Sequence, residues 1–133
     1  MSEEREGTAD AGGRRLKERT REFALRTIRL YAALPKSTVA QVLGKQLLRS
    51  GTSVGAHYRE GCRSRSRAEF VSKLEGSLQE LEESRYWLEL LEAERLVPAA
   101  VLGPLVQEAD ELTAMIIASV RTVKARGREQ NAE

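Results

Sequence analysis

Four segments of this sequence carry apolar residues at intervals of three and four positions, and breaks at proline or serine separate the segments. That spacing places the apolar side chains on one face of an α-helix, whereas a half-buried strand would alternate with a period of two. Each helix therefore has one apolar stripe to bury against its neighbours. The sequence predicts an all-α fold: an antiparallel, up-down-up-down four-helix bundle in a single domain.

Local signals set the expected helix ends in the first half of the chain. Pro35 ends the first helix, because the residue before a proline is pushed away from α geometry. Ser37 is a good N-cap for the second helix. Ser66 and Glu69 have the spacing of a capping box before the third helix. These signals predict short connections, which favour antiparallel neighbours.

The fourth helix and the chain ends set the domain boundaries. Pro98 suits the first turn of the fourth helix, whereas Pro104 either marks a later start or kinks the first turns. Residues 1–17 are polar and contain glycine, so we expect a disordered tail. The bundle is then expected over 18–126, followed by a frayed basic end at 127–133.

The stretch RSGTSVGAHYREGC, residues 49–62, has three glycines and no proline. Fourteen residues would be a long connection in a bundle, so we interpret 38–62 as one continuous helix. Glycine inside a helix costs about 1 kcal/mol relative to alanine, and close approach of a neighbouring helix would offset that cost. The bundle occupies only one side of this helix, so we expect a second contact with another subunit. The expected interface residues are Gly51, Gly55, Tyr58 and Trp87.

A line of polar residues follows one side of the same helix. Buried polar groups need hydrogen-bond partners, and an unpaired one costs about 1–3 kcal/mol. The third helix offers such partners at helical spacing. We therefore expect a buried polar cluster between the second and third helices, with His57 and Glu60 largely buried in it. Its expected members are Gln46, Ser50, Ser53, His57 and Glu60, with Glu80, Glu83 and Ser84 opposite them.

Charge is distributed unevenly along the chain. Residues 23–73 carry ten Lys/Arg and two acids, whereas residues 74–111 carry two Lys/Arg and ten acids. One interpretation is that basic helices lie beside acidic ones, within or between subunits. The other is a basic surface for nucleic acid, since phosphate contacts need clustered Lys and Arg. The candidate nucleic-acid-binding residues are Arg59, Arg63, Arg65, Arg67 and Lys73.

Signatures of catalysis are missing. The chain has one histidine and one cysteine, which excludes the usual Cys/His zinc site within one chain. Three carboxylate-bearing pairs, at 57/60, 80/83 and 108/111, have helical spacing, but a ferritin-like site needs more histidines. We expect no enzyme activity, no catalytic residue, no metal and no cofactor.

A single cysteine, Cys62, gives no disulfide framework and fits a reducing compartment, so we expect a cytoplasmic protein. The first residues contain no apolar run of the signal-peptide kind. No stretch reaches the apolar length of a membrane span, so we expect no membrane partner.

Two long runs, QLLRSGTSVGAHYREG and SRAEFVSKLEGSLQELEESRYWLELL, carry a family resemblance. The chain resembles, over about 20–126, the four-helix bundle proteins encoded in intervening sequences of bacterial 23S ribosomal RNA genes. The accessory protein of diversity-generating retroelements belongs to the same family. The resemblance implies a homo-oligomer, typically a pentameric ring, and for the retroelement member it implies binding to nucleic acid and to a reverse transcriptase. Many relatives have asparagine where this chain has His57.

The functional expectation is therefore a non-enzymatic oligomeric bundle. It would bind RNA or DNA, or act as an adaptor beside a nucleic-acid enzyme such as a reverse transcriptase. The alternative is a purely structural or protein-interaction ring, in which the charge asymmetry only joins subunits.

Overall fold

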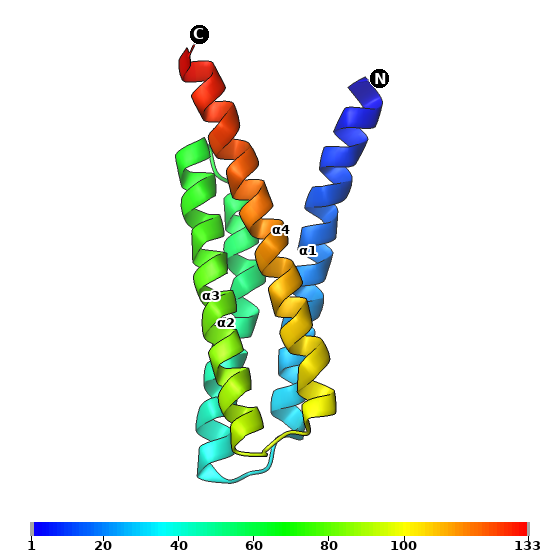
Figure 1. Cartoon of the computed structure of the whole chain (residues 1–133), viewed down its shortest axis with the longest axis vertical. Helices are drawn as coiled ribbons and strands as arrows, with labels where there is room; N and C mark the ends of the chain where they lie inside the picture. Colours follow the sequence, from blue (N-terminus) through cyan, green and yellow to red (C-terminus); the bar gives the residue numbers. More distant parts are fainter. Residues whose placement is uncertain (1, 133) are drawn as a thin grey trace.

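The computed structural model describes the backbone of residues 2–132 and the side chains of residues 12–130. Four helices follow one another: α1 (Ser2–Ala33), α2 (Thr38–Cys62), α3 (Arg67–Ala93) and α4 (Ala99–Ala132). Figure 1 shows them as long rods joined by short connections, with both chain ends at the same end of the molecule. This confirms the prediction of an all-α four-helix bundle.

Contacts between residues show that neighbouring helices run antiparallel. On α1 and α2, Gly44 faces Leu34 whereas Gly55, farther along α2, faces the earlier Thr20. On α2 and α3, the order is likewise reversed, because Ser50 bonds to Ser84 and the backbone of Val54 bonds to Ser77. Ion pairs Arg85–Asp110 and Lys124–Glu75 give the same direction for α3 and α4. Towards the chain ends α1 and α4 diverge (Figure 1).

The expected helix starts are confirmed by their caps. The hydroxyl of Ser37 accepts a hydrogen bond from the backbone N–H of Ala40 at 3.3 Å. The hydroxyl of Ser66 accepts one from the backbone N–H of Glu69 at 3.1 Å. Pro98 directly precedes α4, and Pro104 lies inside that helix, so α4 does not start later.

Both helices at the chain ends are longer than expected. α1 begins at Ser2 instead of near residue 18, and Leu16, within the expected tail 1–17, is only 4% exposed and belongs to the core. α4 runs on to Ala132, so residues 127–132 of the expected frayed segment 127–133 are helical, and residue 133 lies outside the described residues. Once a helix is anchored in a core, each further turn adds hydrogen bonds without a new nucleation step. The polar composition of the ends is therefore compatible with helix.

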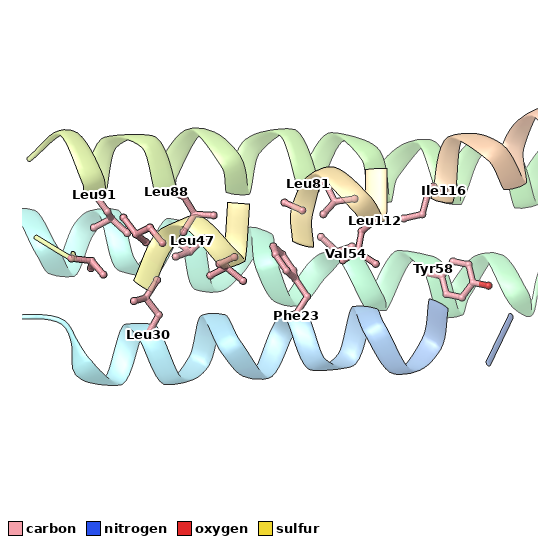
Figure 2. Packing of buried hydrophobic residues seen from close by; sticks show 14 of the residues in the cluster. Phe23, Leu30, Leu47, Val54, Tyr58, Leu81, Leu88, Leu91, Leu112 and Ile116 are labelled. Atoms are coloured by element: carbon pink, nitrogen blue, oxygen red, sulfur yellow. The ribbon is translucent and has the colours of Figure 1, made fainter. Parts of the chain in front are cut away.

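The core lies along the centre of the bundle, and all four helices contribute to it (Figure 2). Phe23, Leu47, Leu81 and Leu112, one from each helix, are each at most 1% exposed. These side chains come from the apolar stripes that the spacing predicted. None of the helices within residues 2–132 has an apolar stretch long enough to cross a lipid bilayer.

Candidate functional site

The glycines of α2 pack against α1. A Cβ atom built on Gly51 would lie 2.5 Å from Cγ2 of Thr27, and one on Gly55 would lie 3.2 Å from Oγ1 of Thr20. Both threonines are fully buried. Their hydroxyls donate to carbonyl oxygens of their own helix, so close packing leaves no hydroxyl without a partner. The small residues therefore let α1 and α2 approach closely.

This packing gives the predicted interface residues of α2 a place inside the single chain. Gly51 and Gly55 face α1 inside the chain, and Tyr58 is 4% exposed and belongs to the core. Burial raises the pKa of the Tyr58 phenol. Close packing on α1 accounts for the glycine-rich face within the single chain, and an interface role for these three residues stays a prediction. Trp87 is only partly buried, so its interface role stays a prediction.

The predicted polar cluster forms a face shared by α2 and α3, and its fully buried centre is small. Ser84 donates to the hydroxyl of Ser50 at 2.8 Å, and Ser50 donates to the carbonyl oxygen of Leu47. Both serines are 0% exposed. A third buried serine, Ser77, donates to the carbonyl oxygen of Val54 at 2.9 Å. Serine hydroxyls therefore join α2 to α3 in the interior.

Arg49 organises the outer part of this face. Its guanidinium bonds to Glu83 and lies 3.4 Å from Glu80, and both carboxylates come from α3. The hydrogen bond from Arg49 lowers the pKa of Glu83 and, together with a smaller contribution from Trp87, keeps that carboxyl ionised; the same bond raises the pKa of Arg49. The indole N–H of Trp87 donates to Glu83 at 3.2 Å. One arginine thus connects two helices through an ionic network.

Burial of the predicted polar residues needs correction. The side chain of Glu60 is 52% exposed and that of His57 is 35% exposed. Lys73 lies 3.0 Å from Glu60, and its hydrogen bond lowers the pKa of that carboxyl. Gln46 is exposed, while Ser53, Glu80 and Glu83 are intermediate. In the single chain only Ser50 and Ser84 are buried as predicted, because the line of polar residues curves from the core towards solvent.

The candidate nucleic-acid-binding residues divide into two groups. Lys73 forms an ion pair with Glu60, and Arg67 donates a hydrogen bond to the neutral amide of Gln130, so both side chains already have partners. Arg59, Arg63 and Arg65 are exposed, and among the described residues they have no ion-pair or hydrogen-bond partner. We call these three residues the arginine turn, because they lie at the end of α2 and in the connection to α3.

Basic and acidic segments do lie beside each other within the chain. Besides the Arg49 network, Arg19 of α1 forms ion pairs with Glu108 at 2.7 Å and with Glu111 at 3.5 Å of α4. Lys124 of α4 pairs with Glu75 of α3. Of these contacts, the Arg49 network joins the basic segment 23–73 to the acidic segment 74–111, and the arginine turn is left as a separate feature. No cluster of three or more His, Cys, Asp or Glu able to hold a metal ion occurs in the described part of the chain.

Sequence reasoning missed Arg49 and Thr20, and it placed Thr27 on the core-facing stripe of the first helix without recognising its contact with a glycine. Arg49 is three residues from Gln46 and four from Ser53, so it lies on the polar side that the spacing identified. Thr27 lies opposite Gly51 and Thr20 lies opposite Gly55, so a glycine of α2 faces each threonine. Residues spaced three, four or seven apart share one face of a helix, so small residues at these spacings on two successive helices are the signal that could have found this close pair.

The fold, the serine contacts and the ionic face define a class of small four-helix bundle proteins. The family model described as 23S rRNA-intervening sequence protein matches residues 15–118. The chain belongs to this family. It is also similar to a crystal structure from Bacteroides thetaiotaomicron, described as a protein with unknown function from the S23 ribosomal protein family. That structure is 34% identical, with 83% of this chain and 98% of that chain covered and a TM-score of 0.79. A comparison with curated proteins found no match.

Proposed function

We propose that this chain is a non-enzymatic, self-associating helical bundle that binds the phosphate backbone of nucleic acid. It would act beside a nucleic-acid enzyme such as a reverse transcriptase, which is the role that the resemblance implies for the retroelement member of the family. The observation that carries the proposal is the arginine turn. Arg59, Arg63 and Arg65 are three exposed cations without a partner among the described residues, within seven positions of the chain.

Exposed arginines without carboxylate partners suit phosphate binding. A guanidinium donates two parallel hydrogen bonds to phosphate oxygens, and each contact releases condensed counterions from the nucleic acid. Elsewhere in this bundle Arg19, Arg49 and Arg85 are held by carboxylates of neighbouring helices. The arginine turn has no base-stacking aromatic residue within it, which favours binding without sequence preference.

Self-association would use the outer side of α2 and α3. We define this outer α2/α3 face as Val39, Val42, Arg49, Glu83 and Trp87. Val39 and Val42 are 55% and 54% exposed, which is unusual for two valines one helical turn apart. Next to them the Arg49–Glu83–Trp87 network has opposite charges already paired, so a second copy can cover it without leaving an isolated charge. A ring of copies would repeat the arginine turn and raise its effective affinity.

The binding proposal is tested with labelled DNA and RNA oligonucleotides and fluorescence anisotropy at low salt. Replacing Arg59, Arg63 and Arg65 together with alanine should weaken binding at least tenfold. The matched control replaces Arg26, Lys36 and Lys45, which also lack partners among the described residues, and removes the same charge elsewhere. Equal loss in both triple variants would reject a localised site. No binding by the wild-type protein would reject the proposed function.

Self-association has its own test and is also the basis of the alternative function. Light scattering at micromolar concentration should give a mass several times 14.8 kDa. Val42→Glu should lower that mass, whereas Val101→Glu, at an equally exposed valine of α4, should not. A monomeric wild-type protein would reject self-association. An oligomer that binds no nucleic acid would support the alternative, an interaction ring built from the outer α2/α3 face.

A further inference from the structure

A shallow groove runs along the outer side of α1 and α2. It has a volume of about 270 Å³ and is lined by residues of both helices. Its two charged lining residues are Arg21 from α1 and Arg59 from α2, and no carboxylate lines it. The full lining is Thr20, Arg21, Ala24, Thr52, Gly55, Ala56 and Arg59.

The close packing of α1 on α2 explains the shape of this groove. Because Gly55 lies against Thr20, the floor consists of backbone and small side chains. The two arginines come from different helices and therefore stand on opposite rims. Both are exposed, and neither has an ion-pair or hydrogen-bond partner among the described residues. The groove thus combines a floor that a polymer backbone can approach with two free cations.

The groove continues into the arginine turn. Arg59 lies in the last turn of α2, and Arg63 directly follows the end of that helix at Cys62, four positions further along the chain. On α1, Lys17 precedes Arg21 by four residues, and α1 runs antiparallel to α2, so Lys17 extends the other rim in the same direction. The one acidic residue of α2, Glu60, pairs with Lys73 of α3 and so faces away from the groove. Positive charge therefore borders the groove on both helices, with Lys17 and Arg21 on α1 and Arg59 on α2, and it continues along the chain to Arg63.

We infer that the α1/α2 groove binds the phosphodiester backbone of the nucleic-acid strand that the arginine turn contacts. This inference rests on the proposed function, and it assigns Arg21, which the sequence pattern did not single out, as a phosphate-binding residue. Guanidinium groups on both rims hold phosphate oxygens, and the small floor lets the sugar–phosphate chain lie against the helices. With no aromatic side chain in the lining, the groove recognises the backbone and not the bases.

The test compares two single variants of α1, Arg21→Gln and Arg26→Gln. Both remove one positive charge from the same helix, but Arg26 lines a different groove, between α1 and α4. Binding of labelled DNA and RNA oligonucleotides is measured by anisotropy over a range of salt concentrations. Arg21→Gln should weaken binding several-fold and reduce the slope of log affinity against log salt by about 0.7–0.9, the value for one phosphate contact. Arg26→Gln should leave both unchanged.

The outcomes separate the groove from the proposed function. If the arginine-turn variants lose binding while Arg21→Gln behaves like Arg26→Gln, the groove inference is wrong and the proposed function stands. If the wild-type protein binds no oligonucleotide at low salt, both are wrong. Ala56→Glu provides a second measurement, because a carboxylate in the groove should repel the strand more than the same change at exposed Ala118 of α4. Equal effects of those two changes would also overturn the groove inference.

Discussion

Replacing Gly51 with alanine tests the close packing of α1 on α2. The added Cβ would lie 2.5 Å from Cγ2, 2.9 Å from Oγ1 and 3.0 Å from Cβ of Thr27. Thr27 is β-branched, fully buried and bonded through its hydroxyl to the carbonyl oxygen of Ala24, so it cannot move aside easily. Overpacking of this kind costs about 1–3 kcal/mol. Alanine returns about 1 kcal/mol of helix propensity, so the net loss should be about 0–2 kcal/mol.

A matched substitution has the opposite expected sign. A Cβ on Gly127 of α4 meets nothing within 4 Å, so Gly127→Ala should raise stability by up to about 1 kcal/mol. Gly55→Ala should lie between the two, because its closest contact is 3.2 Å. Urea unfolding followed by circular dichroism gives all three values. The order of stability should be Gly127→Ala, then Gly55→Ala, then Gly51→Ala.

A double-mutant cycle identifies the cause. Thr27→Ala removes the two side-chain atoms that the new Cβ meets most closely, so Gly51→Ala should be tolerated much better in that background. A Gly51→Ala variant as stable as Gly127→Ala would refute the close packing. So would additive effects of Gly51→Ala and Thr27→Ala.

Three further predictions concern single contacts. Ser50→Ala should destabilise the protein by about 1–3 kcal/mol, because it leaves the buried Ser84 hydroxyl without its acceptor. Ser84→Ala should cost less, because the Ser50 hydroxyl keeps its hydrogen bond to the carbonyl oxygen of Leu47. Urea titrations that reverse this order of stability would contradict the assigned direction of the Ser84–Ser50 bond. The hydrogen bond from Arg49 lowers the pKa of Glu83 in the folded protein. The ionised carboxylate therefore contributes fully to the unfolding free energy above the ordinary glutamate pKa of about 4.3. That contribution is lost as the pH falls through the pKa of Glu83 in the folded protein. Glu83→Gln should therefore flatten the fall of the unfolding free energy on this acid side, and an unchanged pH profile would count against the network. Arg95 has a φ of 56°, and the N–H of the next residue bonds back to the carbonyl of Leu91, which is the helix-ending geometry that glycine favours. Arg95→Gly should raise the melting temperature whereas Arg95→Ala should not, and equal effects of the two would show that the backbone is unstrained there.

The fold was predictable because its signals are local and agree with one another. Apolar spacing identified the four helices, and Ser37 and Ser66 marked two of their starts. The continuous helix through residues 49–62 followed from the absence of proline. The extent of α1 and α4 was not predictable from composition, because a polar segment continues a helix once residues such as Leu16 anchor it.

The site was predictable only in part, because sequence spacing gives the side of a helix and not what lies opposite. Spacing grouped Ser50 with the polar residues of α2 and suggested Ser84 as a partner. It gave no means to tell whether Gly51 and Gly55 meet another helix of the chain or another subunit. It also grouped Arg67 and Lys73 with the other candidate nucleic-acid-binding residues, although each has a side-chain partner on another element.

The salt dependence of nucleic-acid binding tests the central claim most directly. Each phosphate contact contributes about 0.9 to the slope of log affinity against log salt for duplex DNA and about 0.7 for a single strand. Replacing Arg63 and Arg65 with glutamine should reduce the magnitude of the slope by about 1.8 or 1.4 per bound chain. The same slope in the wild-type and variant proteins would contradict phosphate binding by the arginine turn.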